Sequence, residues 1–305
     1  MSGFASDRSS GSTGVAARFL DELERWVLLD RSPDAQQLRA GLFLWLREAQ
    51  ANQPSMALVH QFAARALSVL NAGLQRADDL PALRRNLTES CQAERDDLAA
   101  SIESAAKTAA GTITRKGAWI ATLSHSGSVL AALRLLQSQG REPRALVAES
   151  RPGNEGRAMA AALAESGIAT LLVVDAALPL LLSQASALWL GADAVTEFGA
   201  LNKIGSYAAA LAAREHGVPV YAIASRRKFL PAGTPALAIA EQAPSEVWDA
   251  PPSLVRPRNF YFEIVPLTLL QGVVVEDDVV GPAEAKIIAA DRALPDELAT
   301  APPKA

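Results

Sequence analysis

The segment "RALVAESRPGNEGRAMAAALAESGIATLLVVD" (144–175) contains two apolar runs with a helical run between them. The apolar runs, 144–149 and 169–175, are short and rich in Val, Leu and Ala, as buried strands are. The stretch 155–166 has helical spacing and stops at Gly167. Apolar strands separated by helices are typical of a parallel sheet that is covered on both faces. This segment therefore predicts a βαβ unit.

The same alternation extends over the chain from about Gly117 onward. Further short apolar runs predict strands at 119–123, 187–193, 218–225 and 261–266, and 272–280 predicts a short strand or a hairpin. Helical runs at 128–139, 178–185 and 205–216 separate them. The repeated alternation predicts an α/β class with a doubly wound parallel sheet.

The part of the chain before this alternation has a different period. From Val15 to about Ala110 the apolar residues recur at helical spacing, as Phe19, Leu23 and Val27 do. The stretch 1–14 is rich in Ser and Gly, which favours a flexible tail. We therefore expect a tail at 1–14, a helical domain at 15–112 and an α/β domain at 113–305.

Composition excludes several classes of protein. The chain has 305 residues and a net charge of −4 with no basic tract, which argues against nucleic acid as a partner. No apolar run reaches the roughly 18 residues of a membrane span. The first residues lack the layout of a secretory signal, so we expect a cytoplasmic protein.

The few candidate metal ligands and nucleophiles are scattered. Cys91 is the single cysteine, which excludes an internal disulfide and a zinc site built from cysteines. Its place in a charged helix favours a small surface or interface residue, and His60 fits a packing role. Neither a G-x-G-x-x-G loop after the first strand nor a P-loop is present. We therefore expect neither a metal nor a cofactor.

Polar residues gather where the predicted strands end, which is where α/β sheets bind ligands. Asp193 follows a buried run and is either a general acid or base with a raised pKa or a capping residue. Asn202 and Lys203 precede a helix start, an arrangement that suits phosphate, although an ordinary turn with a solvated lysine is the alternative. Lys228 is either a second cation at this edge or part of a solvated charge run.

The loop "SHSGS" (124–128) follows the first predicted strand and precedes a helix. It lacks the G-x-S-x-G pattern of a serine-hydrolase elbow, and adjacent Ser and His residues do not form a catalytic dyad. We expect its backbone N–H groups and Ser128 to face an anion, and His125 to orient the loop rather than to transfer protons.

Three of these motifs together resemble a known family. "ESRP" (149–152), "GAD" (191–193) and "NKIG" (202–205) occur in the order and at separations similar to those of the translation initiation factor 2B alpha/beta/delta subunit family. Its superfamily includes methylthioribose-phosphate isomerase and ribose-bisphosphate isomerase. The resemblance runs from about Gly117 through "GVVVED" (272–277). It implies a helical domain followed by a Rossmann-like domain, in a homodimer or a larger homo-oligomer.

In the isomerases of that superfamily, a thiol and a carboxylate interconvert an open-chain aldose phosphate and its ketose. The resemblance places the carboxylate at Asp193 and a phosphate-binding pair at Asn202 and Lys203. It assigns further phosphate contacts to Ser128 and Lys228.

The chain departs from the isomerase pattern at two positions. Ser126 occupies the position of the thiol, and a serine hydroxyl ionises far less readily than a cysteine. Gln53 occupies the position of an arginine that binds phosphate, so a charged bidentate contact is lost. Both departures are more similar to the translation-factor subunits.

Two functions remain open from the sequence. The first is binding of a phosphorylated sugar or nucleotide, such as a pentose phosphate or a nucleoside monophosphate, with aldose–ketose isomerisation of the ribose-bisphosphate isomerase type. The alternative is a non-catalytic regulatory subunit that senses a phosphorylated metabolite and acts through protein–protein contacts. Asp193 beside the Asn-Lys pair favours the first, and Ser126 and Gln53 favour the second.

Overall fold

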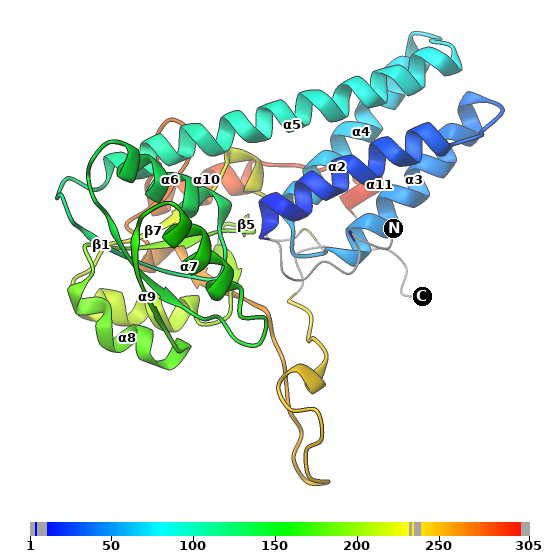
Figure 1. Ribbon diagram of the computed structural model, residues 1–305. Helices are drawn as coiled ribbons and strands as arrows, with labels where there is room; N and C mark the ends of the chain where they lie inside the picture. The colour runs from blue at the N-terminus through cyan, green and yellow to red at the C-terminus, as the bar shows by residue number, and fades with distance from the viewer. Residues whose placement is uncertain (1–3, 5–10, 232–233, 235–238, 300–305) are drawn as a thin grey trace.

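The computed structural model describes residues 4, 11–231, 234 and 239–299. Its first part is a group of four helices, with the longest running along one side of the whole molecule (Figure 1). These helices are α2 (Ser12–Leu29), α3 (Ala35–Asn52), α4 (Ala57–Gln75) and α5 (Leu80–Gly111).

The apolar spacing of the first helices produces their packing. The buried face of α2 includes Phe19, Leu23 and Val27, as the sequence predicted. Phe19 contacts the rings of Trp45 from α3 and Phe62 from α4, with centroids 5.3 and 6.3 Å away. This cluster joins three helices around one aromatic centre.

Helix α5 connects this helical region to the sheet. Its N-terminus is capped by Asp79, whose carboxylate accepts a hydrogen bond from the Ala82 N–H at 2.8 Å. Near its C-terminal end Ala105 and Ala109 are buried against α6 (Gly127–Ser138). Small side chains let the two helices approach closely, so α5 belongs to both cores.

The second part is a seven-stranded sheet in the order β10-β9-β7-β4-β1-β2-β3. All neighbouring pairs are parallel except β9 and β10, which confirms the mixed α/β class and the predicted βαβ units. The strands are β1 (Trp119–Leu123), β2 (Arg144–Ala148), β3 (Ala169–Val173), β4 (Ala187–Gly191), β7 (Val220–Ile223), β9 (Gly272–Val274) and β10 (Val279–Val280).

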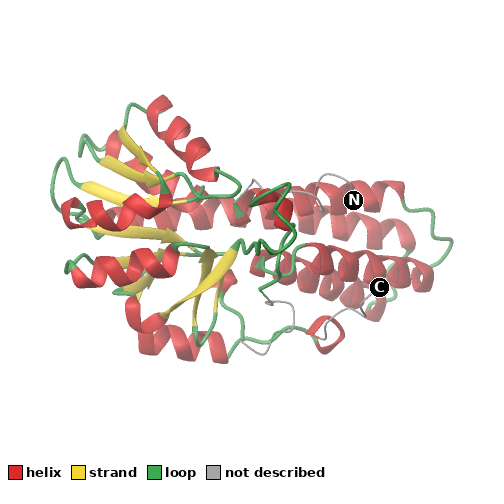
Figure 2. Ribbon diagram, turned by 90° about the horizontal axis from the view of Figure 1, so that it is seen from below, coloured by secondary structure: helices red, strands yellow, loops and turns green. Residues whose placement is uncertain are grey.

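Helices cover the sheet between its strands (Figure 2). Besides α6 they are α7 (Glu155–Glu165), α9 (Ser206–Glu215) and α10 (Pro282–Ala290). The predicted helix at 178–185 is broken into α8 (Leu178–Leu181) and flanking 3-10 turns, the first at Asp175–Ala177 and the second at Leu182–Gln184. The segment 272–280 is a hairpin, one of its two predicted forms.

One predicted strand belongs to a different sheet. The segment at 261–266 forms β8 (Phe262–Pro266), which pairs antiparallel with β6 (Gly199–Lys203), and β6 pairs antiparallel with β5 (Ala194–Val195). No strand was predicted in 194–203, because Thr, Glu, Asn and Lys interrupt the apolar pattern of this segment. This small sheet carries Asn202 and Lys203 on a strand rather than on a loop.

Described residues near both ends of the chain pack in the helical region. Phe4, within the stretch predicted as a tail, is buried against Phe19, and α2 already begins at Ser12. The short helix α11 (Asp296–Ala299) packs against α4 and buries Leu298 in the helical core. The rest of 1–14 lies mainly outside the described residues. Within the described chain, no helix has the length and apolarity to cross a membrane.

Cys91 corrects one prediction. It was expected at a helix surface or an interface, but it is 2% exposed within the helical core. Burial raises the pKa of its thiol to about 12. Cys91 is therefore a core residue and not a reactive nucleophile.

Candidate functional site

A cavity lies between the helical region and the carboxyl ends of the sheet strands. Its wall combines the start of α2, the α3–α4 turn, the loops after β1 and β4, strand β6 and the segment before β8. The lining residues are Gly11, Ser12, 52–56, 123–127, Glu155, 191–193, Asn202, Lys203, Ala240, Gln242, Tyr261 and Phe262. Segments from Gly11 to Phe262, far apart in the sequence, thus form one site.

Asp193 follows β4 and lines this cavity. Burial is the largest effect on its carboxyl group and raises its pKa, although Lys228, a hydrogen bond from Ser12 and Lys203 act in the opposite direction. Its backbone N–H donates to the Leu201 carbonyl at 2.8 Å, so the small sheet fixes its position. The raised pKa favours the neutral acid, which can donate a proton.

Lys228 is buried next to this acid but does not line the cavity. Its Nζ donates hydrogen bonds to the Ala192 carbonyl at 2.6 Å and to the Ser12 hydroxyl at 2.8 Å. Burial lowers the pKa of its ammonium group, and Asp193 and Glu276 partly oppose that effect. Its contacts place Lys228 behind Asp193 rather than in contact with the cavity.

Ser126 lines the cavity and begins helix α6. Its hydroxyl accepts a hydrogen bond from the Val129 N–H at 3.4 Å, which is an N-cap contact. A Cβ at Gly191 would come within 2.9 Å of the Ser126 hydroxyl oxygen, so the glycine of the "GAD" motif makes room for this side chain. Ser126, which the resemblance gives as the thiol position, therefore lies directly against the loop that carries Asp193.

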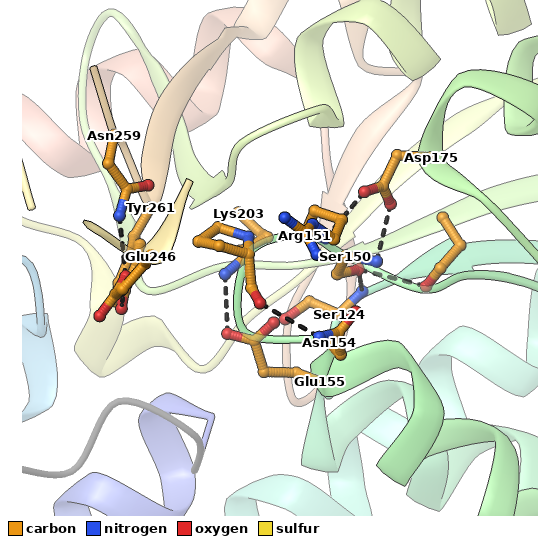
Figure 3. Close-up of polar contacts among 12 residues, drawn as sticks. Ser124, Ser150, Arg151, Asn154, Glu155, Asp175, Lys203, Glu246, Asn259 and Tyr261 are labelled. Atoms are coloured by element: carbon orange, nitrogen blue, oxygen red, sulfur yellow. Dashed lines mark hydrogen bonds and ion pairs between the residues drawn. The ribbon is translucent and has the colours of Figure 1, made fainter. Parts of the chain in front are cut away.

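Asn202 and Lys203, both predicted as site residues, line the same cavity from β6. The Asn202 amide donates to the Ser206 hydroxyl at 2.9 Å. Lys203 Nζ donates to the Glu155 carboxylate at 2.7 Å and lies 4.6 Å from the centre of the Tyr261 ring (Figure 3). The positive charge of Lys203 thus has a buried carboxylate partner.

Gln53 also lines the cavity and is buried. Its amide donates to the Phe4 carbonyl at 3.0 Å, which ties the start of the chain to the α3–α4 turn. His60 supports the same turn, because its Nε2 lies 3.1 Å from the Pro54 carbonyl. Burial lowers the pKa of His60 to about 4, as fits the packing role predicted for it.

The predicted phosphate contact Ser128 takes a different place. It is buried in the first turn of α6 and does not line the cavity. His125 does line it, and burial, its largest effect, lowers the pKa of its imidazole. The structure therefore brings together Asp193, Ser126 and Gln53 with the Asn-Lys pair, whereas Ser128 and Lys228 stay behind the cavity wall.

Three further lining residues were missed as site residues by the sequence analysis. Glu155 accepts the hydrogen bond of Lys203, and Ser12 accepts one from Lys228. The Tyr261 ring makes a cation–π contact with the Lys203 ammonium group. Glu155 was readable as a charged residue in a loop after a strand, beside two glycines. Ser12 and Tyr261 had no such signal, because their contacts arise only from the folded chain.

A comparison with known protein families matches residues 8–282 to the initiation factor 2 subunit family. The chain belongs to this family. Among curated relatives, a putative methylthioribose-1-phosphate isomerase of Aeropyrum pernix is 30% identical over 66% of this chain and 57% of its own length. A ribose 1,5-bisphosphate isomerase of Archaeoglobus fulgidus is 30% identical over 58% of each chain. The chain thus spans less than two thirds of these relatives.

Solved structures extend the match over nearly the whole chain. The translation initiation factor eIF-2B of Pyrococcus horikoshii has a TM-score of 0.78 and 26% identity, covering 92% of this chain and 94% of its own. The 5-methylthioribose 1-phosphate isomerase of the same organism has a TM-score of 0.75 at 22% identity, covering 94% and 84%. The second likeness shows a shared fold alone. Isomerases and initiation factors therefore share this architecture.

Proposed function

We propose that the cavity binds a phosphorylated sugar and that Asp193 is its acid–base group in an aldose–ketose interconversion. The observation that carries this proposal is a buried carboxyl group with a raised pKa inside a cavity that Ser126, Asn202 and Lys203 also line. Relatives named as sugar-phosphate isomerases support the same class of ligand.

The aldose phosphate and its ketose contain the same atoms, so the reaction only moves hydrogens. A hydrogen leaves carbon 2 and another joins carbon 1, while the carbonyl and hydroxyl groups exchange positions. Neutral Asp193 would donate its proton to the carbonyl oxygen on carbon 1, and the resulting carboxylate, stabilised by Lys228 and Ser12, would then take the proton of the hydroxyl on carbon 2. The hydrogen on carbon 2 would pass as a proton to the ionised oxygen of Ser126, which would return it to carbon 1. Asn202 and Lys203 are proposed as ligand contacts, because both face the cavity.

Ligand binding and turnover are tested separately. Thermal shift measurements with pentose phosphates, pentose bisphosphates and nucleoside monophosphates would detect binding, and NMR would follow the aldose and ketose signals. Asp193→Asn should remove turnover while keeping the thermal shift. A folded protein that none of these compounds stabilises would contradict the proposal.

The second candidate is a regulatory subunit that binds the metabolite without converting it. Ser126 favours this candidate, because its hydroxyl caps helix α6 and no thiol stands at that position. Binding without any change in the NMR signals would support it. We further propose a homodimer or larger homo-oligomer, which light scattering on the purified protein would measure.

A further inference from the structure

The carboxylate of Glu155 has one oxygen with a hydrogen-bond partner and one without. Oε1 accepts the hydrogen bond from Lys203 Nζ at 2.7 Å. Oε2 is buried and has no hydrogen-bond partner among the described residues. Glu155 is 8% exposed and lines the cavity. A buried carboxylate oxygen without a donor is unfavourable, and a ligand that supplies a donor would remove that cost.

The loop before Glu155 holds this carboxylate in place (Figure 3). The Asp175 carboxylate accepts hydrogen bonds from the backbone N–H groups of Ser150 and Arg151, both at 2.7 Å. A Cβ at Gly153 would lie 2.5 Å from Glu155 Oε1, so only glycine leaves room for the carboxylate there. The loop therefore has a fixed backbone and leaves space beside Gly153 for the Glu155 carboxylate.

The charges at this end of the cavity decide which ligand group fits. Among the described lining residues, the Glu155 carboxylate is the direct hydrogen-bond partner of the Lys203 ammonium group, whereas Asp193 lies next to Lys228 and burial raises its pKa. Glu155 already neutralises that ammonium group. A phosphate dianion placed here would meet a like charge at short range, which low polarity makes costly. A sugar hydroxyl would instead donate its hydrogen to Oε2 without any added charge.

We propose that Glu155 determines specificity by making the Lys203 end of the cavity a hydroxyl site. In this arrangement Oε2 accepts a hydrogen bond from the sugar, and the phosphate lies at another part of the cavity. This inference rests on the proposed sugar-phosphate ligand. It differs from the sequence-based expectation that Lys203 binds phosphate.

Isothermal titration calorimetry with ribose 5-phosphate and with inorganic phosphate tests it. In the wild-type protein, ribose 5-phosphate should bind more tightly than inorganic phosphate. Glu155→Gln leaves the charge of Lys203 uncompensated and removes the proposed hydroxyl acceptor. The dissociation constant of inorganic phosphate divided by that of ribose 5-phosphate should therefore fall about tenfold or more. Glu165→Gln, an exposed change at the other end of α7, should leave the ratio unchanged.

A second variant addresses the unpaired lysine that Glu155→Gln creates. The double change Glu155→Ala with Lys203→Met removes both charges, which avoids a buried unpaired ion. It should weaken ribose 5-phosphate and leave inorganic phosphate unchanged. Weaker binding of inorganic phosphate would place the phosphate on Lys203 and overturn the inference.

The outcomes separate this inference from the proposed function. A wild-type protein that binds no sugar phosphate would contradict both. A wild-type protein that binds ribose 5-phosphate, with the same ratio in Glu155→Gln, would contradict only the role of Glu155.

Discussion

The ammonium group of Lys228 donates a hydrogen bond of 2.8 Å to the hydroxyl of Ser12, 216 residues earlier in the chain. The same hydroxyl is hydrogen-bonded to the Asp193 carboxylate. One serine at the start of α2 thus links a buried cation with the proposed acid. Without that serine, both side chains would lose a polar neighbour in a place where they are buried.

Ser12→Ala should therefore destabilise the protein by about 1–3 kcal/mol, because it leaves the buried polar groups of Lys228 and Asp193 with fewer hydrogen bonds. Urea denaturation would measure the change in the free energy of unfolding. The control is Ser138→Ala at the exposed end of α6, which should cost no more than about 0.5 kcal/mol. Equal effects of the two changes would show that the Ser12 link adds nothing to stability.

Ser126→Cys should raise isomerase activity by about tenfold or more, because a thiol ionises more readily than a hydroxyl at the same position. It should also cost about 1 kcal/mol, since cysteine is a poorer N-cap than serine. NMR of the sugar phosphate measures the first effect and thermal unfolding the second. Ser138→Cys introduces an exposed thiol as the control. An inactive Ser126→Cys protein that still binds ligand would favour the regulatory candidate.

His60 should make the protein less stable in mild acid. The pKa of His60 is about 4 in the folded chain and 6.5 when exposed. Its contribution to the free energy of unfolding is therefore complete above pH 6.5. The unfolded chain takes up the proton first as the pH falls, and the stability contributed by neutral His60 is lost between pH 6.5 and about 4. At about 1.4 kcal/mol per pKa unit, the loss of stability has an upper value of roughly 3.5 kcal/mol.

Urea denaturation between pH 7 and pH 4 would measure this loss. His60→Asn should flatten the pH dependence at some cost in stability at pH 7. The matched change His216→Asn at an exposed helix end should leave the pH dependence as it is. An unchanged slope in His60→Asn would assign the acid sensitivity to other groups.

Cys91 should react slowly with thiol reagents in the native protein. Its side chain is buried and burial raises its pKa to about 12, so the reactive thiolate is scarce at pH 8. The rate of reaction with a disulfide reagent should rise by orders of magnitude in urea. The exposed thiol of Ser138→Cys gives the fast reference rate within the same fold. A native Cys91 that reacts as quickly as this reference would mean that the helical core opens readily.

Much of the fold was predictable from local pattern. The strands of the parallel sheet are continuous apolar runs because both faces are covered, and the segment 144–175 shows this directly. The antiparallel strand at Gly199–Lys203 was not predictable in this way. It carries Asn202 and Lys203 among smaller apolar residues, and its pairing with β8 joins residues about sixty positions apart.

The candidate site was likewise predictable only in part. The sequence by itself predicted Asp193 and the Asn-Lys pair from their places after apolar runs and Ser126 and Gln53 from the family resemblance, and all five residues line one cavity. Only the tertiary structure decided their electrostatics. Burial raises the pKa of Asp193, Ser12 reaches Lys228 from the other end of the chain, and Glu155 neutralises Lys203. Charge compensation depends on distances of a few ångströms between remote residues, and spacing along a chain does not encode those distances.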